Sequence, residues 1–151
     1  MPSHDLEALW EDHCRQEFET CDVDATMATM VAAPYVNHVP TMTGGVGHDQ
    51  LKRFYKYHFI GGNPLDTALV PVSRTIGTDQ IVDEMVFSFT HTSEVDWMLP
   101  GVAPTGRRVE IALVAIVRFV DGKVAHEHFY WDQASVLVQV GLLDPKGLPV
   151  A

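Results

Sequence analysis

The segment 107–131 predicts a β-hairpin, and this hairpin constrains the fold more than any other part of the sequence. Two apolar-rich stretches flank the dipeptide Asp121-Gly122. Asp-Gly between such stretches favours a two-residue type I′ turn. Side chains along each strand then alternate between two faces, so regular pairing decides which residues face the interior. A slip of one residue would exchange the two faces.

Regular pairing from this turn places one row of polar side chains toward the protein interior: His126, His128, Tyr130 and Asp132. Leu113 and Ala115 of the facing strand are expected beside them as substrate-binding residues. A carboxylate among apolar side chains loses hydration, which raises its pKa toward the range of a general base. Asp132 is therefore the first predicted catalytic residue. Asp is also a favoured N-cap, and a helix is expected to begin directly after it.

Elsewhere the sequence predicts helices first and antiparallel strands afterwards. Helical spacing of apolar residues indicates helices after an N-cap at Ser3 and over 24–31, 48–60 and 133–140. Alternating patterns indicate strands over 35–38, 68–76, 80–92, 107–120 and 123–131. This order predicts an α+β fold, a cone-shaped, curved mixed or antiparallel sheet wrapped around N-terminal helices. One domain over residues 1–151 is expected.

Charge and hydropathy argue against several classes of binding partner. Twenty acidic and ten basic residues give a formal charge of −10, which repels phosphate backbones and argues against nucleic-acid binding. No apolar run approaches the roughly 20 residues of a membrane span. The acidic N-terminus does not resemble a secretory signal, so a cytoplasmic location is expected. Cys14 and Cys21 are seven residues apart on one predicted helix, which is too far for a disulfide.

Five short motifs follow one another at characteristic spacing: Asn37-His38-x-Pro40, Gly44-Gly45-x-Gly47, Pro104-Thr105-Gly106, Arg118-Phe119-x-Asp121-Gly122-Lys123, and Asp132 before Gln139-Val140-Gly141. Together they resemble the SnoaL-like polyketide cyclases of the nuclear-transport-factor-2-like superfamily. The resemblance implies that an aspartate matching Asp132 is the general acid/base of an aldol-type ring closure. Cyclases often have Glu and Trp where this chain has His126 and His128, so the native reaction need not be cyclisation.

His38 is the second predicted catalytic residue, because it follows a strand and precedes a Pro-containing loop at the expected cavity mouth. Tyr35 and Asn37 lie on the opposite face of a regular strand. The Tyr-x-Asn pair resembles water-holding residues of limonene-type epoxide hydrolases, which also need an Asp–Arg–Asp arrangement. The remaining substrate-binding candidates are Phe54 on the third helix and two residues of an apolar loop, Trp97 and Met98.

These features predict a cofactor-independent acid–base enzyme, either a cyclase, an isomerase or a dehydratase. Its substrate is expected to be a hydrophobic, carbonyl-containing small molecule such as a polyketide. The alternatives are a non-catalytic ligand-binding or accessory module, a dimerisation module with a filled interior, and an epoxide hydrolase. The lone His126-x-His128 pair is a weak metal signal, so no metal is expected. A homodimer is expected through the outer sheet face, which regular pairing assigns to Phe129 and Trp131.

Overall fold

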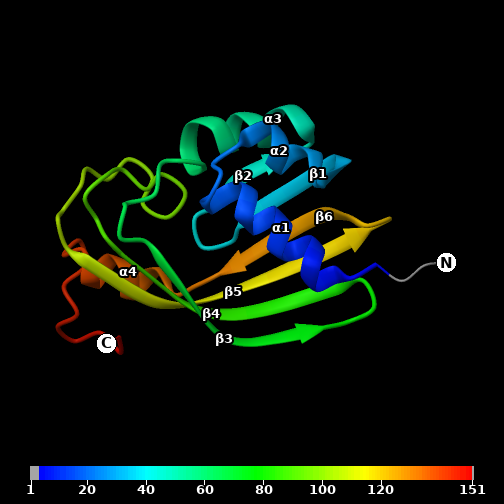
Figure 1. Ribbon diagram of the computed structural model, residues 1–151. Helices are drawn as coiled ribbons and strands as arrows, with labels where there is room; N and C mark the ends of the chain where they lie inside the picture. Colours follow the sequence, from blue (N-terminus) through cyan, green and yellow to red (C-terminus); the bar gives the residue numbers. More distant parts are fainter. Residues whose placement is uncertain (1–3, 151) are drawn as a thin grey trace.

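A curved, open sheet of six strands forms the framework of the computed structural model, which describes residues 4–150 (Figure 1). The strands are β1 (Met30–His38), β2 (Thr43–Val46), β3 (Ala68–Ile76), β4 (Gln80–Thr90), β5 (Arg108–Val120) and β6 (Lys123–Tyr130). Their spatial order is β2-β1-β6-β5-β4-β3. The pairing of β1 with β6 is parallel and the other pairs are antiparallel, so the sheet is mixed.

Helices cover the concave side of this sheet. Helix α1 (Leu6–Phe18) lies across the strands, and α2 (Val23–Ala28) and α3 (His48–Phe54) lie near β1 and β2 (Figure 1). One π-helical turn, η1 (Tyr55–Phe59), continues α3, and α4 (Gln133–Gln139) follows β6. The predicted α+β cone, with a curved mixed sheet around N-terminal helices, is confirmed. No helix of the described chain has both the length and the apolar character needed to cross a membrane.

Helix α1 buries a face that is half apolar and half polar. Its N-cap is Asp5, whose side chain accepts a hydrogen bond from the backbone N–H of Ala8 at 3.1 Å; the predicted cap, Ser3, lies outside the described residues. The buried residues recur at helical spacing and are Leu6, Trp10, His13 and Glu17. Polar groups on a buried face need partners, because lost hydration is costly. The partners of α1 come from β6.

The hairpin between β5 and β6 has the predicted turn but not the predicted register. Asp121 and Gly122 both have positive φ, 50° and 74°, as a type I′ turn requires. Two residues later the ladder shifts, because Ala125 is an extra residue: Val124 pairs with Phe119, whereas His126 pairs with Arg118. Such a bulge sets two residues of one strand against one of the other.

The bulge reverses the two faces of β6 beyond it, so the predicted orientation is wrong. The side chains that face α1 are those of Glu127, Phe129 and Trp131. His126, His128 and Tyr130 lie on the convex face instead. The alternation along β5 is as predicted, with Leu113 and Ala115 buried on the concave side. One inserted residue therefore replaces the expected row of imidazoles with a glutamate between aromatic side chains.

Other differences lie near β1. This strand begins at Met30, inside a segment predicted as helix, and β2 forms within a predicted loop. The close pairing of these strands depends on Gly44, whose φ is 142°. A Cβ at Gly44 would lie 1.9 Å from the carbonyl oxygen of Val36, so only glycine fits there. The Gly44-Gly45 motif thus serves the β1–β2 hairpin, which positions His38 at its end.

Candidate active site

A cavity of about 490 Å³ lies between α1 and the concave face of the sheet. Its lining includes six aromatic side chains, Trp10, Phe18, Phe59, Phe87, Trp97 and Phe129. Three buried polar side chains also line it: Glu17 from α1, His38 from β1 and Asp83 from β4. An apolar cavity with few convergent polar groups is the usual form of a small-molecule site.

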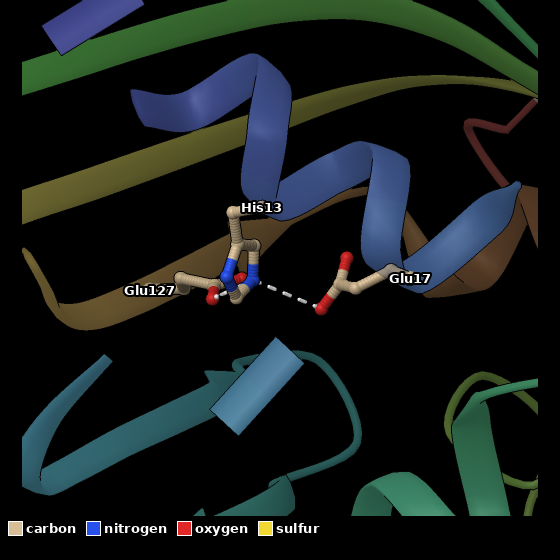
Figure 2. Close-up of side chains that lie close together, drawn as sticks. All are labelled: His13, Glu17 and Glu127. Carbon is tan, nitrogen blue, oxygen red and sulfur yellow. Dashed lines mark hydrogen bonds and ion pairs between the residues drawn. The ribbon is translucent and has the colours of Figure 1, made fainter. Parts of the chain in front are cut away.

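Glu17 belongs to a buried cluster that joins α1 to β6. Nε2 of His13 lies 3.1 Å from Oε1 of Glu17 and 2.9 Å from Oε1 of Glu127. Figure 2 shows the two carboxylates approaching the same imidazole from opposite directions. All three side chains are buried, so the charges are poorly screened by water.

The hydrogen bonds of His13 identify it as an imidazolium. The Thr29 hydroxyl donates to the carbonyl oxygen of Thr26 at 2.6 Å, so it accepts from Nδ1–H of His13, also at 2.6 Å. Nε2–H then faces both carboxylates. Burial by itself lowers the pKa of His13, but the charges and hydrogen bonds of Glu127 and Glu17 outweigh burial and raise this pKa to about 10.

Glu17 is the acid of this cluster that lines the cavity. Burial raises the pKa of its carboxyl, His13 lowers it, and the charge of Glu127 raises it further, with an upward net shift. Two carboxylates at one nitrogen repel each other, so one of them binds a proton readily. A carboxyl with a raised pKa at a cavity wall is a candidate general acid/base.

Tyr55 completes the cluster on the side away from α1. Its hydroxyl donates to Oε1 of Glu127 at 3.3 Å. Burial, followed by the charges of Glu127 and Glu17, raises the pKa of Tyr55 well above its ordinary value, so the phenol keeps its proton. Tyr55 is the first residue of the π-helical turn, a feature frequent at functional sites. The phenol is thus a permanent hydrogen-bond donor to Glu127.

His38 is the second polar group of the cavity and stays neutral. Its Nδ1 lies 3.1 Å from the carbonyl oxygen of Thr43 and donates to it. Its ring stacks on Phe129 at 4.9 Å and lies 5.0 Å from Trp97. Burial lowers the pKa of His38 to about 4, against the opposing effect of the Thr43 hydrogen bond. With Nδ1 as donor, Nε2 is an acceptor, suited to bind a hydroxyl or enol rather than a carbonyl.

Asp132 does not line the cavity, and the prediction of an apolar environment for it is wrong. Its side chain is exposed and caps α4, accepting from the Ser135 hydroxyl at 2.6 Å and from the Ala134 N–H at 3.1 Å. The hydrogen bond from Ser135, followed by those from the backbone, lowers the pKa of this carboxyl. A lowered pKa favours the charged cap rather than proton exchange near neutrality. The catalytic role of Asp132 stays a prediction without support from its surroundings.

The other predicted site residues divide among three places. The cavity is lined by His38, Trp97 and Leu113. The core holds Phe54, Met98 and Ala115, which are buried but do not line the cavity. The convex face of the sheet carries Tyr35, Asn37, His126, His128 and Tyr130.

On the convex face, Tyr35 stacks on His126 at 4.6 Å, and its hydroxyl lies 3.0 Å from Nε2 of His128. These contacts join the His126-x-His128 pair to β1. They are separated from the cavity by the sheet itself, so the predicted substrate-binding set is split between two sides of the molecule.

Sequence reasoning missed His13, Glu17 and Glu127. A sequence signal exists for the first two residues, because His13 and Glu17 share one helix face with Leu6 and Trp10. Helical spacing of apolar residues alone instead favours a face that includes Cys14 and Phe18. The bulge at Ala125 concealed Glu127.

The buried cluster also contains the kinds of side chain that bind metal ions. Among the described residues, His13, Glu17 and Glu127 form the set whose ligand atoms lie close enough, within 4.8 Å of one another, to hold a cation. His13 Nε2 is the nitrogen that a cation would need, and it already faces both carboxylates as a proton donor. A cation would therefore compete with a proton here.

Arg74 of β3 closes one side of the cavity mouth and is fully engaged by acidic partners. Its Nε and Nη2 lie 2.6 and 2.9 Å from the two carboxylate oxygens of Asp83. Its Nη1 lies 3.0 Å from Glu7 and 3.3 Å from Glu11. Asp83 also accepts from the Trp10 indole at 2.8 Å, which fixes the pair to α1.

Comparisons with known proteins agree with this architecture. A model of the SnoaL-like polyketide cyclase family matches residues 11–140. A structure described as a SnoaL-like polyketide cyclase from Jannaschia sp. CCS1 has a TM-score of 0.68 at 18% identity, covering 95% of this chain and 97% of that one. AclR from Streptomyces galilaeus, described as a hydroxylase, has a TM-score of 0.64 at 22% identity, covering 91% and 85%.

A third similar structure is the epoxide hydrolase/cyclase-like enzyme SalBIII of salinomycin pyran ring formation. Its TM-score is 0.60 at 14% identity, covering 83% of this chain and 89% of that one. A search of curated protein sequences gave no match. At these identities the structural similarity establishes the fold, whereas the reaction has to be argued from the site.

Proposed function

Because the chain belongs to the SnoaL-like polyketide cyclase family, we propose that it is a cofactor-independent acid–base enzyme acting on a hydrophobic, carbonyl-containing small molecule such as a polyketide. The reaction is a cyclisation, isomerisation or dehydration, which share the removal or return of a proton alpha to a carbonyl. The observation that carries the proposal is the position of Glu17, a buried carboxyl at the wall of an aromatic cavity and beside the His13 imidazolium.

In this proposal Glu17 is the proton-transfer group. Its ionised form removes a proton from the carbon next to the substrate carbonyl, and its neutral form returns one. The raised pKa makes the carboxylate a stronger base than an exposed glutamate. His13 and Glu127 hold the carboxyl in place and balance its charge. His38 accepts from an enol or hydroxyl of the substrate through Nε2.

The test is deuterium exchange at an activated carbon. We expect the protein to accelerate incorporation of deuterium from deuterium oxide into β-tetralone, followed by NMR. Glu17→Gln keeps the shape and a hydrogen-bond acceptor but cannot take up the proton, so exchange should fall by about 100-fold or more. Glu110→Gln is the matched control, because Glu110 is exposed on the convex face. Exchange should survive dialysis against EDTA.

Two results would count against this function. Exchange that persists in Glu17→Gln but is lost in Asp132→Asn would return the role to Asp132. Tight binding of hydrophobic ketones without any acceleration by the wild-type protein would favour the non-catalytic ligand-binding module.

A second candidate function, epoxide hydrolysis, is favoured by the acid–arginine–acid arrangement at the cavity mouth. Arg74 lies between Asp83 on one side and Glu7 and Glu11 on the other. This arrangement is similar to the one that the limonene-type enzymes need, although it is built on β3, β4 and α1 rather than near Asp132. Hydrolysis of styrene oxide that is lost in Asp83→Asn, with β-tetralone exchange absent, would favour this function.

We further propose a homodimer formed through the convex face of the sheet. The predicted anchors Phe129 and Trp131 are wrong, because both face the concave side. The convex face instead presents partly exposed apolar side chains of β5, Val114 and Ile116, beside the Tyr35–His126 stack. A partly apolar sheet face of this kind is typically covered by another layer.

A further inference from the structure

Acidic side chains are the most frequent charged groups in the cavity lining. Five carboxyl groups line the cavity, those of Glu7, Glu11, Glu17, Asp83 and Glu84. The lining contains one cationic side chain among the described residues, Arg74, and each of its three nitrogens already contacts a carboxylate. A ligand carboxylate or phosphate would therefore meet uncompensated negative charge and no available cation.

The interior also suits a positive charge. Six aromatic side chains line the cavity, and the faces of such rings attract ammonium groups. Glu17 offers a buried carboxyl among them, and Phe18 follows Glu17 directly on α1, with its ring 5.8 Å from that of Phe59. An aromatic enclosure with one acid at its wall favours a protonated amine over an uncharged group of the same size.

We propose that the ligand of this cavity is a hydrophobic molecule that carries a protonated amine, with its ammonium group at Glu17. The inference rests on the proposed function for the role of Glu17 and adds the chemical class of the substrate. The His13 imidazolium lies between the carboxyl groups of Glu17 and Glu127, and an ammonium at Glu17 would add a second positive charge beside these two acids.

This contact links binding to catalysis. An ammonium beside Glu17 favours the ionised carboxylate, which is the form that removes a proton from carbon. A substrate with an amine would thus promote the activity of its own base, whereas a neutral analogue would not.

The experiment compares three probes of similar size by titration calorimetry at neutral pH and low salt: β-naphthylmethylamine, β-naphthylmethanol and β-naphthoate. We expect the amine to bind at least about tenfold more tightly than the alcohol, and the carboxylate most weakly. In Glu17→Gln the advantage of the amine over the alcohol should disappear, and in Glu110→Gln it should remain.

Equal or tighter binding of the alcohol or the carboxylate would overturn the inference, and so would an amine preference that survives Glu17→Gln. Failure of the amine to bind at millimolar concentration would overturn it as well. The deuterium-exchange experiment separates the two proposals. Exchange that depends on Glu17 without an amine preference leaves the proposed function standing alone. An amine preference without exchange indicates an amine-binding module.

Discussion

Glu17 of α1 and Glu127 of β6 meet at a single imidazole nitrogen, with oxygens 3.1 and 2.9 Å from Nε2 of His13. The two acids are 110 positions apart in the sequence, so their contact ties the N-terminal helix to the centre of the sheet. Because both are buried, the cluster is stable only while its charges balance. Its contribution to stability and its reactivity therefore depend on the same protons.

Stability is expected to fall as the pH rises from neutrality. The pKa of His13 is about 10 in the folded chain and 6.5 ordinarily, so the folded state holds this proton more tightly. The stabilisation is complete below the ordinary pKa and is lost progressively as the pH rises toward the folded-state pKa. Urea unfolding at about pH 7 and about pH 9 should show a loss of roughly 2–3 kcal/mol.

The raised pKa of Glu17 likewise makes stability fall as the pH rises. The lowered pKa of His38 instead weakens the fold only toward acidic pH.

The control is His13→Gln, which retains a neutral donor at this position. It should be less stable at neutral pH by roughly 3–5 kcal/mol, since one partner of a buried ion pair is lost. Its loss of stability between the two pH values should also be smaller than that of the wild type, because the titration of His13 is removed and only the carboxyl groups remain. An unchanged slope in His13→Gln would show that another group titrates.

Asp132→Ala is expected to weaken α4 rather than catalysis. The substitution removes the acceptor for Ser135 Oγ and the Ala134 N–H, so the first turn of the helix loses its cap. We expect the thermal midpoint to fall by a few degrees while β-tetralone exchange is retained. Asp132→Asn, which preserves a capping side chain, should recover most of the thermal midpoint. A loss of exchange in both variants would restore Asp132 as the catalytic acid.

Deletion of Ala125 is expected to be tolerated, because it removes the extra residue and leaves Glu127 opposite Val117. Deletion of His128 is the matched control. It turns Phe129 and Trp131 away from the core and should abolish cooperative unfolding. Circular dichroism in the far and near ultraviolet distinguishes the two outcomes. Equal loss of structure in both deletions would contradict the role given to the bulge.

Ile116→Arg is expected to give monomers. Ile116 is partly exposed at the middle of the convex face, and a charge there would oppose burial against a second copy. Light scattering after size-exclusion chromatography should show twice the chain mass for the wild type and one chain mass for the variant. Leu65→Arg, at a fully exposed loop position, should remain dimeric. A wild-type protein that stays monomeric on concentration refutes the dimer.

The sequence was sufficient to predict the strands β3 to β6, the type I′ turn and the fold class, because period-two alternation and Asp-Gly are local signals. It was insufficient for the site. The bulge at Ala125 has no signature of its own, yet it decides whether Glu127 or His128 faces α1. The pairing of Glu17 with Glu127 depends on how a helix and a distant strand pack, which no local pattern contains. His38, placed by the end of β1, was found correctly at the cavity.

The outermost strand also bears on how a ligand enters. Within the sheet β3 pairs with β4 alone, and the Arg74 side chain adds contacts to Glu7 and Glu11 of α1. Leu69, Pro71 and Val72 of β3 line the cavity and are also exposed on the surface. An edge strand, which is hydrogen-bonded to a neighbouring strand on one side, can detach briefly while the rest of the sheet stays intact. The rate at which a ligand enters is therefore expected to depend on how often β3 detaches. A bound ligand would slow hydrogen exchange of the β3 amides, and the lifetime of the complex would depend on the opening rate of this edge strand.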